Sequence, residues 1–299
     1  RPQCGGDREV NVIGSGRANG AISILHALGT GRGCSVGIQL ATEVQIVDTT
    51  LEVNNDRHGL LDAIESCWRG EGLPIPIEFG WKIESTVPVG QGLKSSSALS
   101  CAALRALNSC AWAGLSNSEI ADLAAKSQLM SNCAITGSMD DNWASLESGW
   151  KLVDPSLGAT DSVIVQGSMD DSLSVLVCLR GKRSAGISPT SFSDHRPIFE
   201  RSLASIMSGS ALDALSSNGM AVSAATGDHE ALRISNLCIA SGAIASGISG
   251  SGPAIAIVCF KDDTESISRK ISGMGLSVIS TRFASSEELL EEVACLAWI

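Results

Sequence analysis

Basic clusters, long apolar runs and paired cysteines are all absent from this sequence. No Lys/Arg cluster occurs in a chain whose formal net charge is −11, so a DNA or RNA partner, which requires a basic footprint, is not expected. No run approaches the roughly 20 apolar residues that span a bilayer, and residues 1–12 contain no apolar core of signal-peptide length. We therefore expect a cytoplasmic protein with no nucleic-acid or membrane partner.

The cysteine and histidine patterns also lack the spacing of a metal site. The ten cysteines form no CxxC pair, and several, such as Cys101 and Cys178, fall singly inside apolar patterns. They are interpreted as buried, reduced thiols rather than disulfide partners. The four histidines are scattered without ligand spacing, so a Cys/His zinc site is not expected. Any metal ion should be held by oxygen ligands.

Length and apolar content indicate two globular domains. The chain has 299 residues, 44% of them hydrophobic, and a domain typically takes about 100–200 residues. The composition changes at residues 154–161, where Pro155, Gly158 and polar residues indicate a junction. We therefore expect an N-terminal domain over residues 1–158 and a C-terminal domain over residues 159–299.

The spacing of apolar residues and breakers predicts a mixture of strands and helices. In the first half we expect a strand or tight element at 17–27, a loop at 29–33, extended runs at 36–47 and 75–83, helices at 59–69, 98–113 and 118–130, and a loop at 136–142. In the second half we expect strands at 150–153, 162–165, 173–179, 254–260 and 276–281, with helical periodicity at 199–218, 229–242, 264–274 and 287–296. Either Ser116 or Asn117 is the expected cap of the helix at 118–130.

The most informative segment runs from Pro88 to Ala98 and reads PVGQGLKSSSA. It joins an extended run to a helix, so its glycines lie in a strand-to-helix turn. Glycine permits positive φ and close backbone approach, and a helix start offers unpaired N–H groups with a partial positive charge. The turn therefore predicts a site for an anion such as a polyphosphate. The alternative is that Ser95 to Ser97 only cap the helix.

Two further segments follow this turn in the chain, TGSMDDNWAS at residues 136–145 and GISGSGP at residues 247–253. Together the three segments resemble the GHMP kinase superfamily, whose signatures are P-x-x-x-G-L-x-S-S-A and G-x-S-G-S-G-P. Within it, GLKSSSA at 92–98 and T-G-x-x-D-D at 136–141 are most similar to the archaeal-type shikimate kinases. Residues 18–33 and the pair Asn218-Gly219 look similar as well, and the resemblance covers most of residues 17–260.

This resemblance implies an α+β fold in two parts, with ATP bound in the cleft between them. The N-terminal domain would be like the second domain of ribosomal protein S5, and the C-terminal domain would be ferredoxin-like, its 247–253 loop lying against the phosphate turn. Mg²⁺ is the implied cofactor. The implied ATP-binding residues are Pro88, Gly90, Gly92, Leu93, Lys94, Ser95, Ser96, Ser97 and Ala98. Of these, Lys94 would act catalytically on phosphate oxygens, and Ser96 matches the serine that reaches the metal, with simple helix capping as its alternative.

The resemblance also implies an acidic catalytic residue and an acceptor site. Asp141 is the candidate general base, with Asp140 as the other candidate, and the alternative is that both aspartates are turn residues bonded to the local backbone. The implied acceptor-side residues are Asp140, Thr136, Asn218, Gly250, Ser251 and Gly252. Arg17 and Arg32 are candidates for binding an acceptor carboxylate, unless they are solvated surface residues.

Two departures from the superfamily pattern accompany these matches. The helix at 118–130 has Ser127 and Gln128 where some members carry a metal-binding glutamate, and Met139 and Trp143 are bulkier than expected beside the acidic pair. The resemblance implies ATP-dependent phosphorylation of a hydroxyl of shikimate, a small-molecule substrate, to give shikimate 3-phosphate. The alternatives are a homoserine kinase or a nucleotide-binding regulatory protein without turnover, and the oligomeric state is left open.

Overall fold

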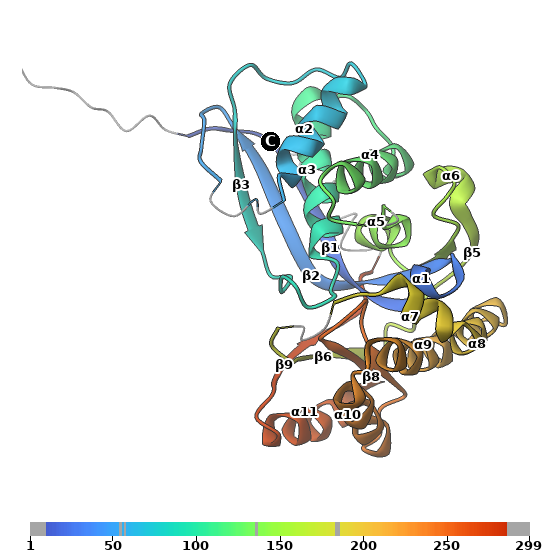
Figure 1. Ribbon diagram of the computed structural model, residues 1–299. Coiled ribbons are helices and arrows are strands. Elements are labelled where there is room, and N and C mark those ends of the chain that lie inside the picture. The colour runs from blue at the N-terminus through green and yellow to red at the C-terminus, as the bar shows by residue number, and fades with distance from the viewer. Residues whose placement is uncertain (1–9, 54–55, 57, 135–136, 183–185, 286–299) are drawn as a thin grey trace, which may run out of the picture.

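Two antiparallel sheets organise the computed structural model, which describes residues 10–53, 56, 58–134, 137–182 and 186–285. Helices pack on each sheet (Figure 1), which confirms the expected α+β class. The helix predicted at 287–296 and the site residue Thr136 lie outside the described residues. Within the described ranges, no helix has the length and apolar character that crossing a bilayer requires.

The first sheet is built on a long hairpin. Strand β1 (Val12–Leu25) pairs with β2 (Gly33–Val47), placing Ser23 opposite Ser35. The other edge of β2 pairs with β3 (Gly80–Ser85) and with β4 (Trp150–Val153), which in turn pairs with β5 (Val163–Gly167). The run predicted as extended from residue 75 forms a strand only from Gly80, because Pro76 has no N–H to donate to the ladder.

Four helices cover one face of this sheet: α2 (Leu60–Gly70), α3 (Ser95–Ala111), α4 (Asn117–Met130) and α5 (Met139–Leu146). Helix α3 lies very close to β1, since a Cβ on Gly16 would come within 2.3 Å of the Ala102 carbonyl oxygen. Ser116, not Asn117, caps α4 through a capping box with Glu119. Two short helices, α1 (Ala27–Thr30) and α6 (Ala159–Ser162), lie in the connections.

The second sheet has the order β7-β8-β6-β9, with every pair antiparallel. Its strands are β6 (Leu173–Leu179), β7 (Ala245–Ile248), β8 (Ile255–Phe260) and β9 (Ser277–Thr281). Its helices are α7 (Pro189–Asp194), α8 (Arg196–Met207), α9 (Ala211–Thr226), α10 (His229–Ala240) and α11 (Thr264–Gly273). The helical run predicted at 199–218 is two helices, because Gly209 with φ 85° breaks it.

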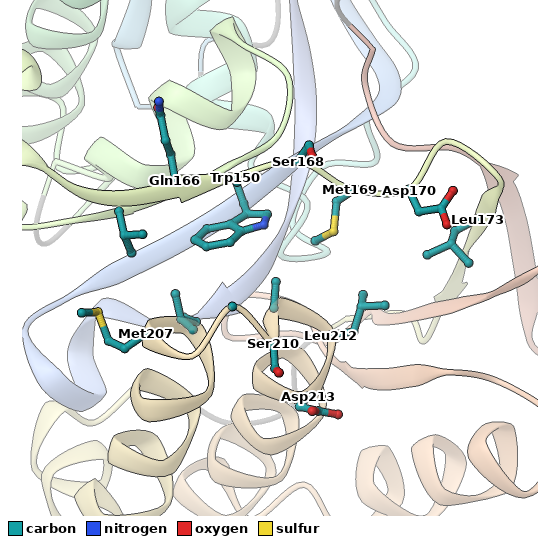
Figure 2. Close-up of a pocket in the computed structure, with 15 residues that line it drawn as sticks. Trp150, Gln166, Ser168, Met169, Asp170, Leu173, Met207, Ser210, Leu212 and Asp213 are labelled. Atoms are coloured by element: carbon teal, nitrogen blue, oxygen red, sulfur yellow. The ribbon is translucent and has the colours of Figure 1, made fainter.

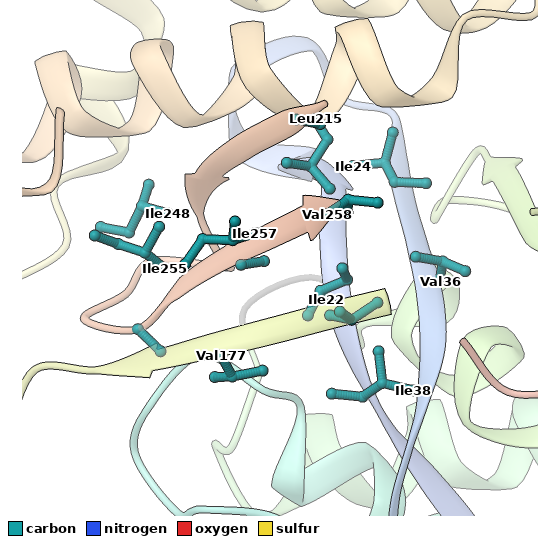
Figure 3. Packing of buried hydrophobic residues seen from close by; sticks show 14 of the residues in the cluster. Ile22, Ile24, Val36, Ile38, Val177, Leu215, Ile248, Ile255, Ile257 and Val258 are labelled. Carbon is teal, nitrogen blue, oxygen red and sulfur yellow. The ribbon is translucent and has the colours of Figure 1, made fainter. Parts of the chain in front are cut away.

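The two sheets share one apolar core. Ile22 and Ile38 of the first sheet belong to the same buried cluster as Val177 and Ile257 of the second (Figure 3). The chain passes between the sheets after β5, and returns near its end, where Phe283 bridges to Ile38 of β2. The division of the chain at residue 158 stays a prediction.

Candidate active site

The segment from Pro88 to Lys94 is a turn between β3 and α3. Its backbone is left-handed at Gly90, Gly92 and Lys94, with φ values of 73°, 80° and 63°. Lys94 is the N-cap of α3, and its side chain makes no capping hydrogen bond. The first N–H groups of α3 are therefore left without a side-chain cap, at the helix end where anions are stabilised.

The other residues predicted in this turn fall into two groups. Ser95, Ser96 and Ser97 form the first turn of α3, so none of them occupies the cap position. The side chains of Leu93 and Ala98 are buried in the core. These two residues therefore position the turn by packing, and the Leu93 carbonyl accepts a hydrogen bond from the N–H of Ala21 at 3.1 Å.

The second glycine loop packs directly on the first, as expected. Ser249 Oγ donates to the Gly92 carbonyl at 2.9 Å and accepts from the N–H of Ser23 at 3.2 Å. A Cβ on Gly92 would lie 2.1 Å from the Ser249 carbonyl oxygen. The N–H of Ala254 also donates to the Gln91 carbonyl at 3.1 Å. The second glycine loop, between β7 and β8, thus packs against the Pro88–Lys94 turn, between β3 and α3.

A buried ion pair lies beside this turn. Lys94 Nζ is 2.8 Å from Asp141 Oδ1, and the two side chains are only 14% and 10% exposed. Asp140 and Asp141 are in the first turn of α5, so the predicted loop at 136–142 is wrong from Met139 onward. Residues 139–146 are all buried, and this fixes both carboxyl groups against α3 and β2 rather than in a solvated turn.

Ser35 of β2 joins the two carboxyl groups. Its Oγ is 2.7 Å from Asp141 Oδ1 and 2.8 Å from Asp140 Oδ2. The neighbouring residue Gly33 leaves room for Asp140, because a Cβ there would be 2.5 Å from Asp140 Oδ1. Ser35 was not predicted from the sequence. Its place beside the acidic pair follows from the register of the β1–β2 hairpin and from the packing of α5 on β2, and neither is visible in the local sequence.

Burial and mutual charge set the ionisation of this cluster. Burial raises the pKa of Asp140 to about 7, and the negative charge of Asp141 raises it further. The positive charge of Lys94 and the hydrogen bond from Ser35 act in the opposite direction. Burial alone would lower the pKa of Lys94, but the charges of Asp141 and Asp140 outweigh it, so that pKa is raised. Lys94 therefore stays protonated beside Asp141.

A buried chain of side chains joins the starts of α3 and α5 to the end of α4. Ser97 Oγ donates to Gln128 Oε1 at 3.3 Å, and Gln128 Nε2 donates to Asn142 Oδ1 at 2.7 Å. Asn142 Nδ2 donates to the carbonyls of Ala121 and Gly137. Both the Oε1 and the Nε2 atom of the Gln128 amide are therefore hydrogen-bonded to neighbouring helices. The motif resemblance implies a glutamate at this place in some superfamily members.

The predicted acceptor residues Asn218 and Ser251 meet at His26. The His26 N–H donates to Asn218 Oδ1 at 2.9 Å, and Nε2 is 3.1 Å from Ser251 Oγ. His26 Nδ1 accepts from the N–H of Leu28, so in the neutral ring Nε2 carries the hydrogen and donates to Ser251. Asn218 is fully buried, and within the described part of the chain its Nδ2 has no hydrogen-bond partner. His26 was not predicted from the sequence, because the resemblance of residues 18–33 assigns this residue no role.

Neither predicted arginine is brought to the acidic pair. Arg17 pairs with Glu43 at 3.6 Å, and Glu43 lies eight residues along β2 from Ser35, which is roughly 25 Å at the rise of a strand. Arg32 pairs with Asp154 at 3.1 Å. Trp143 packs in the core with the Lys151 ammonium 5.0 Å from its ring centroid.

A cavity of about 610 Å³ lies elsewhere, between β5, the start of β6 and the turn from α8 to α9 (Figure 2). Trp150, Met169 and Ile206 line it, and none of the predicted site residues that the structure describes is among its lining residues. Trp150 is opposite Val36, whereas Lys151 is opposite Ser35. Because neighbouring strand residues point to opposite faces, this cavity is on the other face of the first sheet from the Lys94–Asp141 pair.

Comparison with known proteins gives concordant results. The family model of the GHMP kinases N terminal domain matches residues 57–149. The chain is 30% identical over 285 residues to a shikimate kinase of Pyrococcus abyssi, covering 90% of this chain and 98% of that protein. It is 30% identical over 268 residues to a homoserine kinase of Thermoplasma volcanium, covering 81% of this chain and 82% of that one. Among solved structures, the Methanococcus jannaschii mevalonate kinase has a similar fold, with a TM-score of 0.70, 14% identity, and coverage of 95% of this chain and 100% of that one.

Proposed function

Because the chain belongs to the GHMP kinase family and has the α+β fold of its kinases, we propose that it is a shikimate kinase, which transfers the terminal phosphoryl group of ATP to the 3-hydroxyl of shikimate. ATP-dependent phosphorylation is the activity of the family, and the acceptor is the proposal. The observation that carries it is the buried Lys94–Asp141 pair at the uncapped start of α3. Phosphoryl transfer requires this combination of positioning, positive charge and an oriented hydroxyl.

The phosphate turn suits a polyphosphate. Left-handed backbone at Gly90 and Gly92 and the N–H groups of Ser95 to Ser97, at a helix start whose N-cap side chain makes no capping bond, would surround phosphate oxygens with donors. The Lys94 ammonium adds a positive charge at the same end of α3. We therefore assign the ATP phosphates to this turn and give Lys94 the role of neutralising charge on the transferred group.

The oxygen donors here also suit Mg²⁺, which keeps several waters and needs few protein ligands. When bound, the ion neutralises charge on the phosphate oxygens. Ser96, in the first turn of α3, is the proposed protein ligand. Gln128 is not assigned to the metal, because Ser97 and Asn142 occupy its amide.

Asp141 is the proposed general base. Both Lys94 Nζ and Ser35 Oγ approach its Oδ1, and Oδ2 receives neither of these donors. We assign Oδ2 to accept the proton of the attacking hydroxyl. The Lys94 ammonium on Oδ1 places a positive charge beside the group that accepts this proton.

Shikimate is favoured over homoserine by the side chains that meet at His26. His26, Ser251 and Asn218 present neutral hydrogen-bonding groups, and no described residue serves as a partner for the buried Asn218 Nδ2 donor. Such groups match the several hydroxyls of shikimate, while homoserine carries an ammonium that prefers an anionic partner. Similarity to a homoserine kinase makes that enzyme the second candidate.

The test is a coupled ADP-release assay with ATP and Mg²⁺ that compares shikimate, homoserine and mevalonate as acceptors. We expect release that depends on shikimate, with the phosphorylated product identified by mass spectrometry. Release with homoserine instead would keep the kinase mechanism and reject the acceptor. Tight ATP binding without release on any acceptor would contradict the catalytic role and favour a regulatory nucleotide-binding protein.

A further inference from the structure

The contacts of Ser35 require more hydrogens than its own hydroxyl supplies. Its Oγ lies 2.7 Å from one carboxyl oxygen and 2.8 Å from another, and both distances are those of O–H···O hydrogen bonds. A hydroxyl has one hydrogen, whereas an ionised carboxylate has none to donate. With both aspartates ionised, one of the two contacts would set lone pairs against lone pairs in a buried site. A second hydrogen must therefore be on one of the carboxyl groups.

The charges around the pair decide which carboxyl group carries this hydrogen. Lys94 Nζ forms an ion pair with Asp141 Oδ1 at 2.8 Å, so the hydrogen is assigned to the other carboxyl group. Asp140 is 5% exposed and has the negative charge of Asp141 beside it. Burial and a like charge both favour its neutral form.

Other titratable groups near Asp140 do not change this assignment. The Cys34 thiol on β2 is buried, and burial together with Asp140 raises its pKa well above the usual range, so it stays neutral. Lys151 on β4 already pairs at 2.7 Å with Glu147, the C-cap residue of α5. Lys94 at the start of α3 opposes the upward shift, yet the pKa of Asp140 is still raised to about 7.

We propose that Asp140 is a positioning residue that acts as a carboxylic acid: its O–H donates to Ser35, whose own hydroxyl hydrogen is thereby directed to Asp141 Oδ1. With Lys94 on the same oxygen, this leaves Asp141 Oδ2 to face the acceptor hydroxyl. Protonated Asp140 also limits the site to one negative charge, balanced by Lys94. Loss of its proton would add a second negative charge where the phosphates of ATP must bind, which lowers their affinity.

The functional part of this proposal rests on the proposed kinase activity, but its structural part does not. Infrared difference spectroscopy at about pH 6, where ordinary Asp and Glu side chains are ionised, should show the carbonyl stretch of a protonated carboxylic acid. The band should vanish in Asp140→Asn and persist in Asp122→Asn, a matched change on α4 whose carboxylate binds the N–H of Ala159. No band in the wild type, or a band that survives in Asp140→Asn, would overturn the proposal even if the kinase activity is confirmed.

The second readout is the pH profile of kcat/KM for ATP. The Asn amide can donate to Ser35 as the acid does, so Asp140→Asn should keep kcat within about threefold of wild type and lose the alkaline decline, which for a single ionisation approaches about tenfold per pH unit. Asp140→Ala should lower kcat by about 30-fold or more, because Ser35 is no longer directed. Identical alkaline limbs in wild type and Asp140→Asn would refute the proposal. If no acceptor is phosphorylated, the infrared result decides alone, so failure of the proposed function is distinguished from failure of this inference.

Discussion

At the scale of single residues, Asp140 couples protein stability to pH. Its pKa is raised to about 7 in the folded protein, against about 3.9 for an unfolded chain. Between these values the folded state holds a proton that the unfolded state has lost, so the stabilising contribution is complete below about pH 4 and is lost as the pH rises through about 7. Asp140→Asn should therefore gain roughly 2–4 kcal/mol of unfolding free energy relative to wild type between about pH 4 and pH 8.

Urea unfolding of wild type, Asp140→Asn and Asp122→Asn at several pH values measures this difference. The gain should grow with pH only for Asp140→Asn. A difference from wild type that is constant over the whole pH range would show that Asp140 titrates normally in the folded protein.

His26 is expected to act on the acceptor rather than on ATP. It contacts Ser251 and Asn218, and both are predicted acceptor-side residues. His26→Gln should raise KM for the acceptor by about tenfold, the value of one lost oriented hydrogen bond, and leave KM for ATP unchanged. Steady-state kinetics with each substrate varied makes the measurement, with exposed His229→Gln as the control. An equal rise in both KM values would contradict this assignment.

The sequence predicts site residues best where the backbone itself carries the chemistry. Gly92 is recognisable because a left-handed turn before a helix favours glycine, whereas Lys94, which is also left-handed, is recognisable only from the motif that contains it. Ser35 and His26 reach the site only through the pairing of β1 with β2 and the contact of β1 with the second glycine loop. Neither residue type is unusual in a strand or at its end, so no local pattern distinguishes them.

At the scale of elements, the chain Ser97–Gln128–Asn142 fixes α5 relative to α3 and so holds Asp141 near Lys94. Asn142→Ala would leave Gln128 Nε2 and the carbonyls of Ala121 and Gly137 unsatisfied in a buried place. It should cost about 3 kcal/mol of stability, while Ser97→Ala, which removes one weaker bond, should cost about 1 kcal/mol. Chemical denaturation measures both values. Equal and small losses would mean that the chain does not hold the helices together.

Helix α5 shows why local pattern failed at the acidic segment. Its eight residues are all buried, so polar Asp140, Asp141 and Asn142 sit among apolar side chains and no amphipathic period appears. The backbone of the preceding Gly137 and Ser138 is left-handed. The sequence therefore predicts a loop that continues to residue 142, whereas the helix begins at Met139. The helix is buried on all sides because it packs against β2, α3 and α4. These contacts are with distant segments, so the local sequence does not reveal them.

At the scale of the whole molecule, the two glycine loops join the sheets at the phosphate turn, and a matched pair of variants tests this. Gly90 and Gly92 both have positive φ, but a Cβ on Gly90 meets nothing within 4 Å, while one on Gly92 meets the Ser249 carbonyl oxygen at 2.1 Å. Gly90→Ala should cost about 1 kcal/mol, from backbone strain alone. Gly92→Ala should cost several kcal/mol and weaken ATP binding.

Thermal unfolding with and without ATP compares these two variants. If Gly90→Ala and Gly92→Ala behave alike, the loop contact does not matter to the fold or to the nucleotide site.

The α+β class and most of the strands and helices could be predicted from the sequence, but the packing of the two sheets on each other could not. Strands and helices follow local periodicity, and the glycine loops follow motifs. The shared core of Ile22, Ile38, Val177 and Ile257 and the return of Phe283 to β2 depend on pairings between distant segments. Such pairings are fixed by the global packing of apolar faces, so no single window of sequence reveals them.

The most direct test of the central claim is a single-turnover measurement of phosphoryl transfer to shikimate by wild type and Asp141→Asn, together with the ATP affinity of each. The Asn variant keeps the shape of the side chain but cannot accept the proton. We predict a transfer rate lower by about 10³-fold and an ATP affinity within about threefold of wild type, with Asp122→Asn unchanged in both. Transfer by Asp141→Asn within tenfold of the wild-type rate would contradict the assignment of the Lys94–Asp141 pair as the catalytic centre.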